Sequence, residues 1–277
     1  MNLPLPRRRL LIGTAAALAW PALARAQAFD TRHAAWTTLL QRHVRLLRGG
    51  QASQVHYAGA AAERPALKAY LDSLSAVTPA TFQGWAGPAQ MAFLINAYNA
   101  FTVELILTKY PALKSIKDLG SFLSSPWKPK WVPLLGQQVS LDDIEHGMLR
   151  ARGRYDDPRI HFAVNCASIG CPMLREEAFT AERLDAQLDE QARRFLADRT
   201  RNRWNARRGR LEVSKIFDWY GEDFTLGHRG IRSLPGYLAG FADLLADEAA
   251  ARDRIRAGQV EIAFLDYDWA LNDLRPG

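Results

Sequence analysis

Both cysteines of this chain lie in one short stretch, Asp157–Pro172, which also holds one of its six histidines. The apolar run Ile160–Val164 predicts a short buried strand, and Cys166 follows it at the start of a polar loop. A thiol in this position can act as a nucleophile when a base activates it and local dipoles lower its pKa. The backbone N–H groups of residues 167–170 could stabilise an oxyanion. The stretch therefore predicts an active site with Cys166 as its nucleophile.

Two histidines are candidates for the activating base. His161 is nearer to Cys166 in the sequence, but residues five apart on a regular strand point to opposite faces, so direct pairing requires the chain to bend. His146 lies on a helix predicted over residues 141–151, with Glu145 beside it. Neighbours in a helix point about 100° apart, so Glu145 and His146 are not expected to serve one centre equally. For His161, a hydrogen-bonded core histidine is an equal alternative to a catalytic base.

The two thiols have other interpretations. A structural disulfide between Cys166 and Cys171, across four intervening residues, is the simplest state in an oxidising compartment. A pair of plain buried thiols is another possibility. A metal site built from His161 and both cysteines matches no common zinc spacing and lacks a fourth ligand, so we expect no metal and no cofactor. The spacing also differs from the Cys-x-x-Cys pattern of redox proteins.

Several polar residues in apolar segments are candidates for binding or orienting a substrate. Asn96 and Asn99 lie in the most apolar segment, about 89–110, which predicts a central buried helix. They are three residues apart and share a face. Structural ties between this helix and nearby loops explain them equally well. The full set of candidates is Asn96, Asn99, Asn165, Ser168, Asp218 and Tyr220.

Residues 1–26 have the features of an export signal. Three arginines at 7–9 precede an apolar, Ala-rich run, and Ala24 and Ala26 offer small residues to a signal peptidase. Adjacent arginines favour the twin-arginine route, so we expect a periplasmic or secreted protein. The apolar run is short for a membrane span, and we expect no stable membrane insertion after cleavage. Cleavage removes four arginines and no acid from a net charge of +7 and leaves +3, too little to indicate a nucleic-acid partner.

Residues 27–277 predict one α+β domain, rich in helices around a small sheet. Helical patterns or capping residues mark its helices, and two hairpins turn near Gly136 and at Arg208-Gly209. The run Val260–Leu265 predicts a terminal strand. Besides the segments given above, helices are expected over 30–48, 64–75, from 79, over 180–198, 214–220, 233–245 and 248–257.

Five blocks of the sequence, in order along most of residues 27–277, resemble the domain-of-unknown-function family 547. That family has no settled general activity to carry over. Some eukaryotic members are similar at the position of Cys166 and have Ser at that of Cys171, which implies that Cys166 is the functional thiol. The blocks are Met91–Ala100, Ser140–Gly147 with Leu149-Arg150, His161–Ser168 with Cys171-Pro172, Ser214–Tyr220 with Asp223-Phe224, and Tyr267–Trp269.

The leading hypothesis is an exported, thiol-dependent hydrolase or acyltransferase that acts on an amide or acyl bond of an unknown small-molecule or peptide ligand. Cys166 is its nucleophile, His161 or His146 its base, and Glu145 an orienting group. The alternative is a non-catalytic periplasmic binding or scaffold domain, in which Cys166 and Cys171 form a structural disulfide. The two hypotheses differ in whether loss of the thiols abolishes chemistry or only lowers stability.

Overall fold

The computed structural model describes residues 28–120 and 125–274, so the predicted signal segment lies outside the described residues. The fold is helix-rich α+β, as predicted from the sequence. The described strands form several small sheets and not one. Antiparallel pairs are made by β1 (Val44–Leu47) with β2 (Ala52–Val55) and by β3 (Val132–Leu134) with β4 (Gln137–Val139), and β5 (Arg203–Asn205), β6 (Arg210–Val213) and β7 (Ile262–Phe264) form a third sheet.

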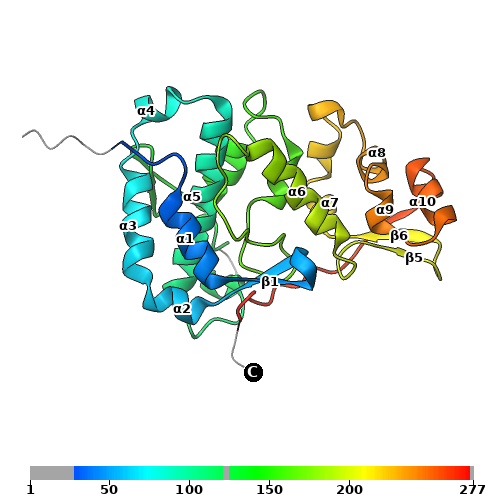
Figure 1. Cartoon of the computed structure of the whole chain (residues 1–277), viewed down its shortest axis with the longest axis horizontal. Coiled ribbons are helices and arrows are strands. Elements are labelled where there is room, and N and C mark those ends of the chain that lie inside the picture. Colours follow the sequence, from blue (N-terminus) through cyan, green and yellow to red (C-terminus); the bar gives the residue numbers. More distant parts are fainter. Residues whose placement is uncertain (1–27, 121–124, 275–277) are drawn as a thin grey trace, which may run out of the picture.

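The helix α5 (Gly87–Leu107) is the centre of the larger hydrophobic core. Its apolar side chains cover nearly all sides, and this pattern requires burial all round. Figure 1 shows it among the N-terminal helices. Within the described residues, no helix combines the length and the apolar character of a membrane span. The helices grouped with α5 are α1 (Ala34–His43), α2 (Tyr57–Ala62), α3 (Arg64–Ser75) and α4 (Pro79–Gln83).

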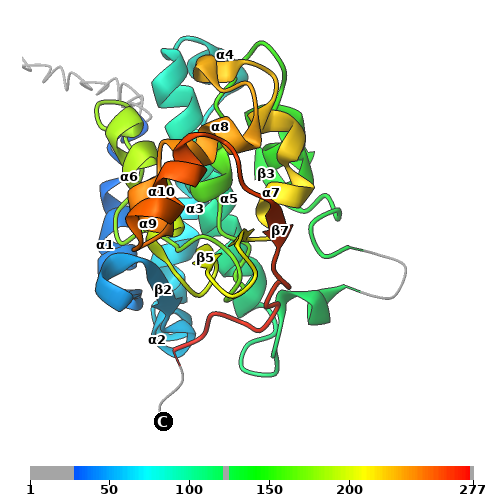
Figure 2. The ribbon, with the colours of Figure 1, turned by 90° about the vertical axis from the view of Figure 1, so that its right-hand side faces the viewer.

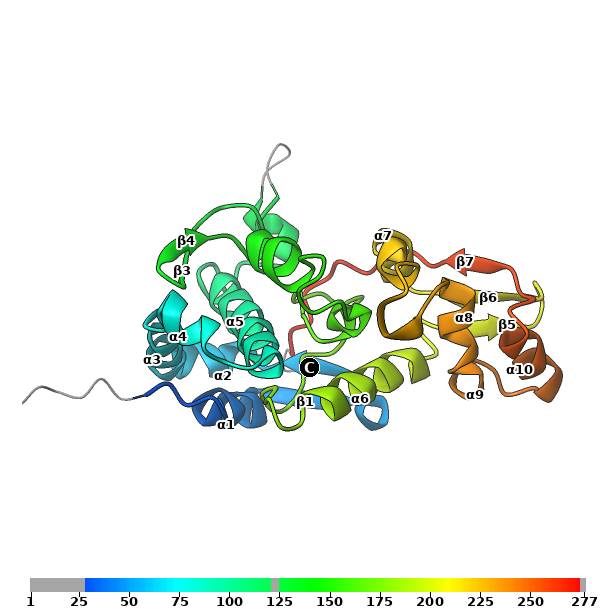
Figure 3. The same ribbon diagram turned by 90° about the horizontal axis from the view of Figure 1, so that it is seen from above.

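A second hydrophobic core lies at the other end of the molecule, around the three-stranded sheet (Figures 1 and 3). The strands β6 and β7 pair in parallel, which requires a long crossover between them. Four short α-helices and two 3₁₀-helices, η5 (Gly221–Phe224) and η6 (His228–Gly230), form this crossover. The helix α6 (Leu184–Ala197) has residues in both cores. The α-helices of the crossover are α7 (Ile216–Trp219), α8 (Leu234–Ala239), α9 (Ala242–Leu245) and α10 (Ala249–Arg256).

The segment before Cys166 is helical, so the predicted strand Ile160–Val164 is wrong. It forms a 3₁₀-helix over Pro158–Phe162 (η4), and Asp157 caps it by accepting a hydrogen bond from the Arg159 N–H at 3.0 Å. Phe162 packs in the second core, whereas residues 160, 163 and 164 pack in the first. A short run that is apolar on all sides fits a buried helical turn as well as a strand. The segment thus joins the two cores.

Other helix boundaries also differ from the prediction. The first helix ends at His43, and the residues that follow it pair as β1. The helix α6 begins at Leu184 and not at Thr180, whose N–H donates instead to the side chain of Gln187 at 3.0 Å. Ser140 and Asp143 form a reciprocal cap at the start of the helix predicted over residues 141–151, with both hydrogen bonds at 2.9 Å. The helix that follows is a π-helix, η3 (Asp143–Leu149).

After β7 the chain returns along the molecule and covers the cysteine loop (Figure 2). Ser168 pairs with Leu271 as an isolated antiparallel bridge, and the Gly170 N–H donates to the Asp268 carbonyl at 2.8 Å. A Cβ at Gly170 would lie 3.0 Å from backbone atoms of Asp268, closer than side chains normally approach. Glycine at this position therefore lets the C-terminal segment lie against the loop.

Candidate active site

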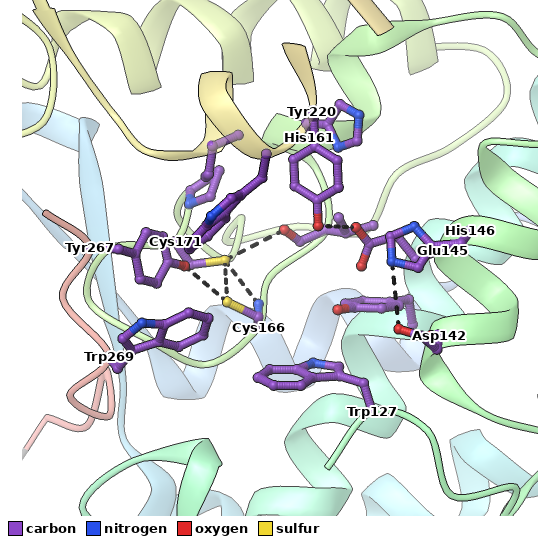
Figure 4. Close-up of a pocket in the computed structure, with 15 residues that line it drawn as sticks. Trp127, Asp142, Glu145, His146, His161, Cys166, Cys171, Tyr220, Tyr267 and Trp269 are labelled. Atoms are coloured by element: carbon purple, nitrogen blue, oxygen red, sulfur yellow. Dashed lines mark hydrogen bonds and ion pairs between the residues drawn. The ribbon is translucent and has the colours of Figure 1, made fainter. Parts of the chain in front are cut away.

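The cysteine loop opens into a cavity of about 250 Å³ at the junction of the two cores. Figure 4 shows the two sulfur atoms on one side of this cavity, with Glu145 and Asp142 on the other. Six of the fifteen described lining residues are tyrosine or tryptophan. The residues that line it are Tyr98, Trp127, Asp142, Glu145, His146, His161, Val164, Cys166, Cys171, Pro172, Ile216, Trp219, Tyr220, Tyr267 and Trp269.

Three polar groups surround the sulfur of Cys166. Its Sγ lies 2.9 Å from Sγ of Cys171, 3.1 Å from Oγ of Ser168 and 3.1 Å from the hydroxyl of Tyr267. Hydrogen bonds from Cys171, then from Ser168 and Tyr267, lower the pKa of Cys166 although burial opposes them. When Cys166 is a thiolate, these three groups are its donors. The surroundings therefore stabilise the nucleophilic form of this thiol.

Cys171 is the buried member of the pair. Burial and the neighbouring thiolate raise the pKa of Cys171 well above its ordinary value. The structure describes both cysteines as free thiols, Cys166 partly exposed and Cys171 buried. When Cys166 is ionised, Cys171 keeps its proton and donates to it. The two free thiols form no disulfide in this structure.

Buried amide side chains hold the cysteine loop in place. On α5, Asn99 donates from Nδ2 to the Ala163 carbonyl at 2.9 Å and accepts from the Asn165 N–H at 2.8 Å. Asn165 in turn donates to the Pro172 carbonyl at 2.7 Å and accepts from the Ala167 N–H at 3.0 Å. These bonds fix the backbone on both sides of the nucleophile.

Ala167, the residue after the nucleophile, has a left-handed backbone with a φ of 62°. This conformation is unfavourable for a residue with a Cβ. Two hydrogen bonds hold it: its N–H donates to Asn165, and its carbonyl accepts from the Asn272 N–H at 3.1 Å. Such strain persists only when the surroundings fix the backbone, and it is frequent at functional sites.

Three of the four backbone N–H groups that the sequence suggested for an oxyanion site are used to fix the loop. The N–H groups of Ala167, Ile169 and Gly170 donate to Asn165, Ala270 and Asp268, respectively. They are therefore committed to fixing the loop. The groups that point at the sulfur are the hydroxyls of Ser168 and Tyr267, which are also 3.0 Å from each other.

His161 is fixed by an acid from the second half of the chain. Its Nε2 lies 2.7 Å from Oδ2 of Asp223, and its ring stacks on that of Tyr220 with centroids 3.9 Å apart. The carboxylate accepts this bond, so Nε2 carries the proton. Burial is the largest effect on the pKa of His161 and lowers it, which favours a neutral ring. The other nitrogen, Nδ1, is buried without a hydrogen-bond partner, and the neutral ring leaves its lone pair free to accept a proton.

Glu145 and His146, which were not expected to serve one centre equally, both line the cavity. The reason is the π-helix η3, in which more residues per turn bring neighbouring side chains closer in direction. Oε1 of Glu145 accepts from the hydroxyl of Tyr220 at 2.8 Å. His146 accepts at Nδ1 from Arg150 at 2.9 Å, and its Nε2 lies 3.5 Å from Oδ1 of Asp142.

The other candidate residues have different surroundings. Asn96 ties α5 to Phe179, with Nδ2 donating to the Phe179 carbonyl at 2.7 Å and Oδ1 accepting from its N–H at 3.0 Å. Asp218 is absent from the described cavity lining and lies 2.7 Å from Nζ of Lys215. The structure therefore gathers Glu145, His146, His161, Cys166 and Tyr220 at the cavity. Ser168 lies beside the sulfur of Cys166, and Asn99 and Asn165 fix the backbone of the cysteine loop.

Residues 82–196 match the model of a family described as "Protein of unknown function, DUF547". Over this segment the chain is similar to the DUF547 family. The match confirms the resemblance found in the sequence and contains α5, the π-helix and the cysteine loop. No curated protein matches the chain. No solved structure matches it.

Several residues of the site lie beyond the matched segment. Asp223, Tyr220 and Tyr267 come from the C-terminal part of the chain. Tyr267 and Asp223 lie in the blocks that resemble the family. Their place in these blocks was the signal that could have identified them as site residues. Asp142 also lies in one of these blocks, Ser140–Gly147, whereas Trp127 lies in none, and only the fold brings Trp127 to the cavity wall.

Proposed function

We propose that this protein is a thiol-dependent hydrolase or acyltransferase that acts on an amide or acyl bond, with Cys166 as the nucleophile. The observation that carries the proposal is the convergence of three donors on Sγ of Cys166 at the wall of a cavity. A thiol held in this way ionises more readily than a free one, and the thiolate is the reactive form.

In the proposed reaction, the proton of Cys166 moves to Nδ1 of His161, directly or through water in the cavity. The sulfur attacks the carbonyl carbon, a C–S bond forms, and the carbonyl electron pair moves to oxygen. The hydroxyls of Ser168 and Tyr267 then donate to that oxygen. The bond to the leaving group breaks, and the leaving group takes the proton from His161. Water or an acceptor nucleophile cleaves the thioester, its proton passes to His161, and the thiolate is restored.

His161 suits the role of base better than His146. Asp223 orients its ring and stabilises the protonated form, and the free nitrogen is the one without a protein partner. The pair corresponds to the base and orienting acid of a catalytic triad. Both ring nitrogens of His146 already face charged groups, Arg150 and Asp142, and this side chain is exposed.

Labelling with activated esters and anilides tests the proposal. We expect incubation with p-nitrophenyl acyl esters and acyl p-nitroanilides to add one acyl group to the intact mass and to release p-nitrophenol or p-nitroaniline. Cys166→Ala should remove both signals, and Cys171→Ala is the matched control that keeps acylation at a lower rate. If Cys166→Ala folds normally and reacts like the wild type, the proposal is wrong and the scaffold alternative gains support.

We further propose that residues 1–26 direct export by the twin-arginine route and that residues 27–277 act as one domain in the periplasm or outside the cell. The support is the arginine run, the apolar segment and the small residues at 24 and 26. Expression in a bacterial host with and without a functional twin-arginine translocase tests this. Mature protein that starts at residue 27 in both hosts would contradict the route, and uncleaved cytoplasmic protein in both would contradict export.

A further inference from the structure

The cavity wall beyond the thiols combines aromatic rings with carboxylates. Trp127, Trp219, Trp269 and Tyr220 contribute rings, and Asp142 and Glu145 contribute carboxyl groups. Among the described residues that line the cavity, none is a lysine or an arginine. The cavity lining therefore has two carboxylates and no permanently charged cation, with the two histidines as its only basic groups among the described residues. The wall instead offers the electron-rich faces of aromatic rings and acidic oxygens, the combination that proteins use to bind ammonium groups.

The pairing of Glu145 leaves its charge available to a ligand. It is buried, and Oε1 accepts a hydrogen bond from the neutral hydroxyl of Tyr220. Arg150, on the turn that follows, is held by Asp223 through bonds of 2.7 and 3.0 Å. A buried carboxylate without a close cation is costly unless a cation reaches it. A ligand ammonium group in the cavity supplies that cation.

Cations already contact two of these rings. Nζ of Lys117 lies 3.7 Å from the ring centroid of Trp269, and the guanidinium of Arg150 lies 5.0 Å from that of Tyr220. Neither basic side chain is part of the described cavity lining. Two rings of the cavity wall therefore already contact a cation. A ring face that is open to the cavity would attract a ligand cation in the same way.

We infer that the site binds a substrate that carries an alkylammonium group, such as a lysine side chain, with this group beside Glu145 and Asp142 and the acyl carbon beside Cys166. This inference rests on the proposed function and names its substrate class. The two ends of the cavity match the two ends of such a molecule, because the carboxylates and the sulfur atoms lie on opposite sides (Figure 4).

The arrangement also couples binding to reactivity. Hydrogen bonds, the one from Cys171 first, lower the pKa of Cys166, and the negative charge of Glu145 partly opposes this lowering. A ligand cation beside Glu145 screens this charge, so an ammonium-bearing substrate increases the thiolate fraction of its own nucleophile. A neutral substrate of the same shape lacks this effect.

A binding measurement tests the inference without any chemistry. The ligands are N-acetyl-lysine methylamide and N-acetyl-norleucine methylamide, which differ by the ε-ammonium group. Their affinities are measured by tryptophan fluorescence on the Cys166→Ala variant, which cannot form a thioester. We expect the lysine ligand to bind at least about tenfold more tightly. Equal affinities would overturn the inference.

Three further variants locate the interaction. Glu145→Gln, and Asp142→Asn to a smaller degree, should reduce the preference for the lysine ligand. Asp218→Asn is the control, because Asp218 is an acid of the same region that pairs with Lys215 and is absent from the described cavity lining. A preference that survives Glu145→Gln, or that Asp218→Asn removes equally, would also overturn the inference.

The two proposals can fail separately. If the lysine preference holds but Cys166 never forms an acyl-enzyme, the ligand class stands and the proposed reaction is wrong. If p-nitrophenyl esters of acetyl-norleucine and acetyl-lysine acylate wild-type Cys166 equally fast, the reaction stands and the ligand class is wrong.

Discussion

Replacement of Asn99 by leucine should loosen the cysteine loop and remove the special reactivity of Cys166. Asn99 bridges a carbonyl and an N–H of that loop, those of Ala163 and Asn165, at 2.9 and 2.8 Å. Leucine has the same branching and number of heavy side-chain atoms but bulkier methyl groups and no hydrogen-bonding group. The substitution therefore leaves one buried carbonyl and one buried N–H without a partner.

Each unsatisfied buried backbone group costs about 1–3 kcal/mol. We therefore expect the free energy of unfolding, measured by urea denaturation, to fall by about 2–6 kcal/mol in Asn99→Leu. The same helix offers a matched control. Asn96 makes the same two bonds to the backbone of Phe179, at 2.7 and 3.0 Å, so Asn96→Leu should lower stability by a similar amount.

Thiol reactivity separates the two variants. Cys166 follows Asn165 directly, so its position relative to its hydrogen-bond donors depends on the bridge made by Asn99. Alkylation of Cys166 by iodoacetamide at neutral pH should slow markedly in Asn99→Leu and stay near the wild-type rate in Asn96→Leu. Equal rates in both variants, at equal stability loss, would refute the assignment of Asn99 as the residue that positions the nucleophile.

Three further predictions concern the thiol pair and the core. Tyr267→Phe removes a donor 3.1 Å from Sγ of Cys166, so the pKa of Cys166 should rise and its alkylation at neutral pH should slow; an unchanged pH profile would exclude this donor. Mild oxidation with diamide should join Cys166 to Cys171, whose sulfur atoms are 2.9 Å apart, and block alkylation until a reductant is added; alkylation that persists after diamide would contradict it. Burial lowers the pKa of His33 from 6.5 to about 4, so the unfolded chain binds a proton below pH 6.5 that the folded chain excludes. Urea denaturation should then show the stability of the wild type falling by on the order of 3 kcal/mol more than that of His33→Gln between pH 7 and 4, and parallel curves would refute it.

The parts of the fold that follow from local sequence were predictable. The central helix α5 is apolar on nearly every side, and such a pattern leaves few alternatives to a buried helix. The reciprocal cap of Ser140 and Asp143 and the hairpin at Gly136 depend on residues a few positions apart. These features are determined by neighbours in the sequence, so the sequence alone indicates them.

The segment before Cys166 was not predictable for a physical reason. Both sides of Ile160–Val164 are covered, since it packs against two different cores. The apolar run therefore has no exposed face whose spacing would distinguish a 3₁₀-helix from a strand. In the helical structure both His161 and Cys166 line the cavity.

The sequence indicated the thiol of the candidate site and several of its polar residues. It did not indicate which of these residues contact one another. Tyr267 reaches Cys166 across 101 positions of the chain, and Asp223 reaches His161 across 62. No local pattern encodes such contacts, which depend on how the C-terminal segment returns over the loop. The same holds for the π-helix that turns both Glu145 and His146 toward the cavity.

The most direct test of the central claim is the rate of alkylation of each cysteine as a function of pH, followed by peptide mass spectrometry on the reduced protein. The structure predicts that Cys166 reacts first, with a midpoint below the ordinary thiol value of about 8.5, and that Cys171 stays unreactive until the protein unfolds. A midpoint for Cys166 at or above the ordinary value, or equal reactivity of both thiols, would contradict the role of Cys166 as an activated nucleophile.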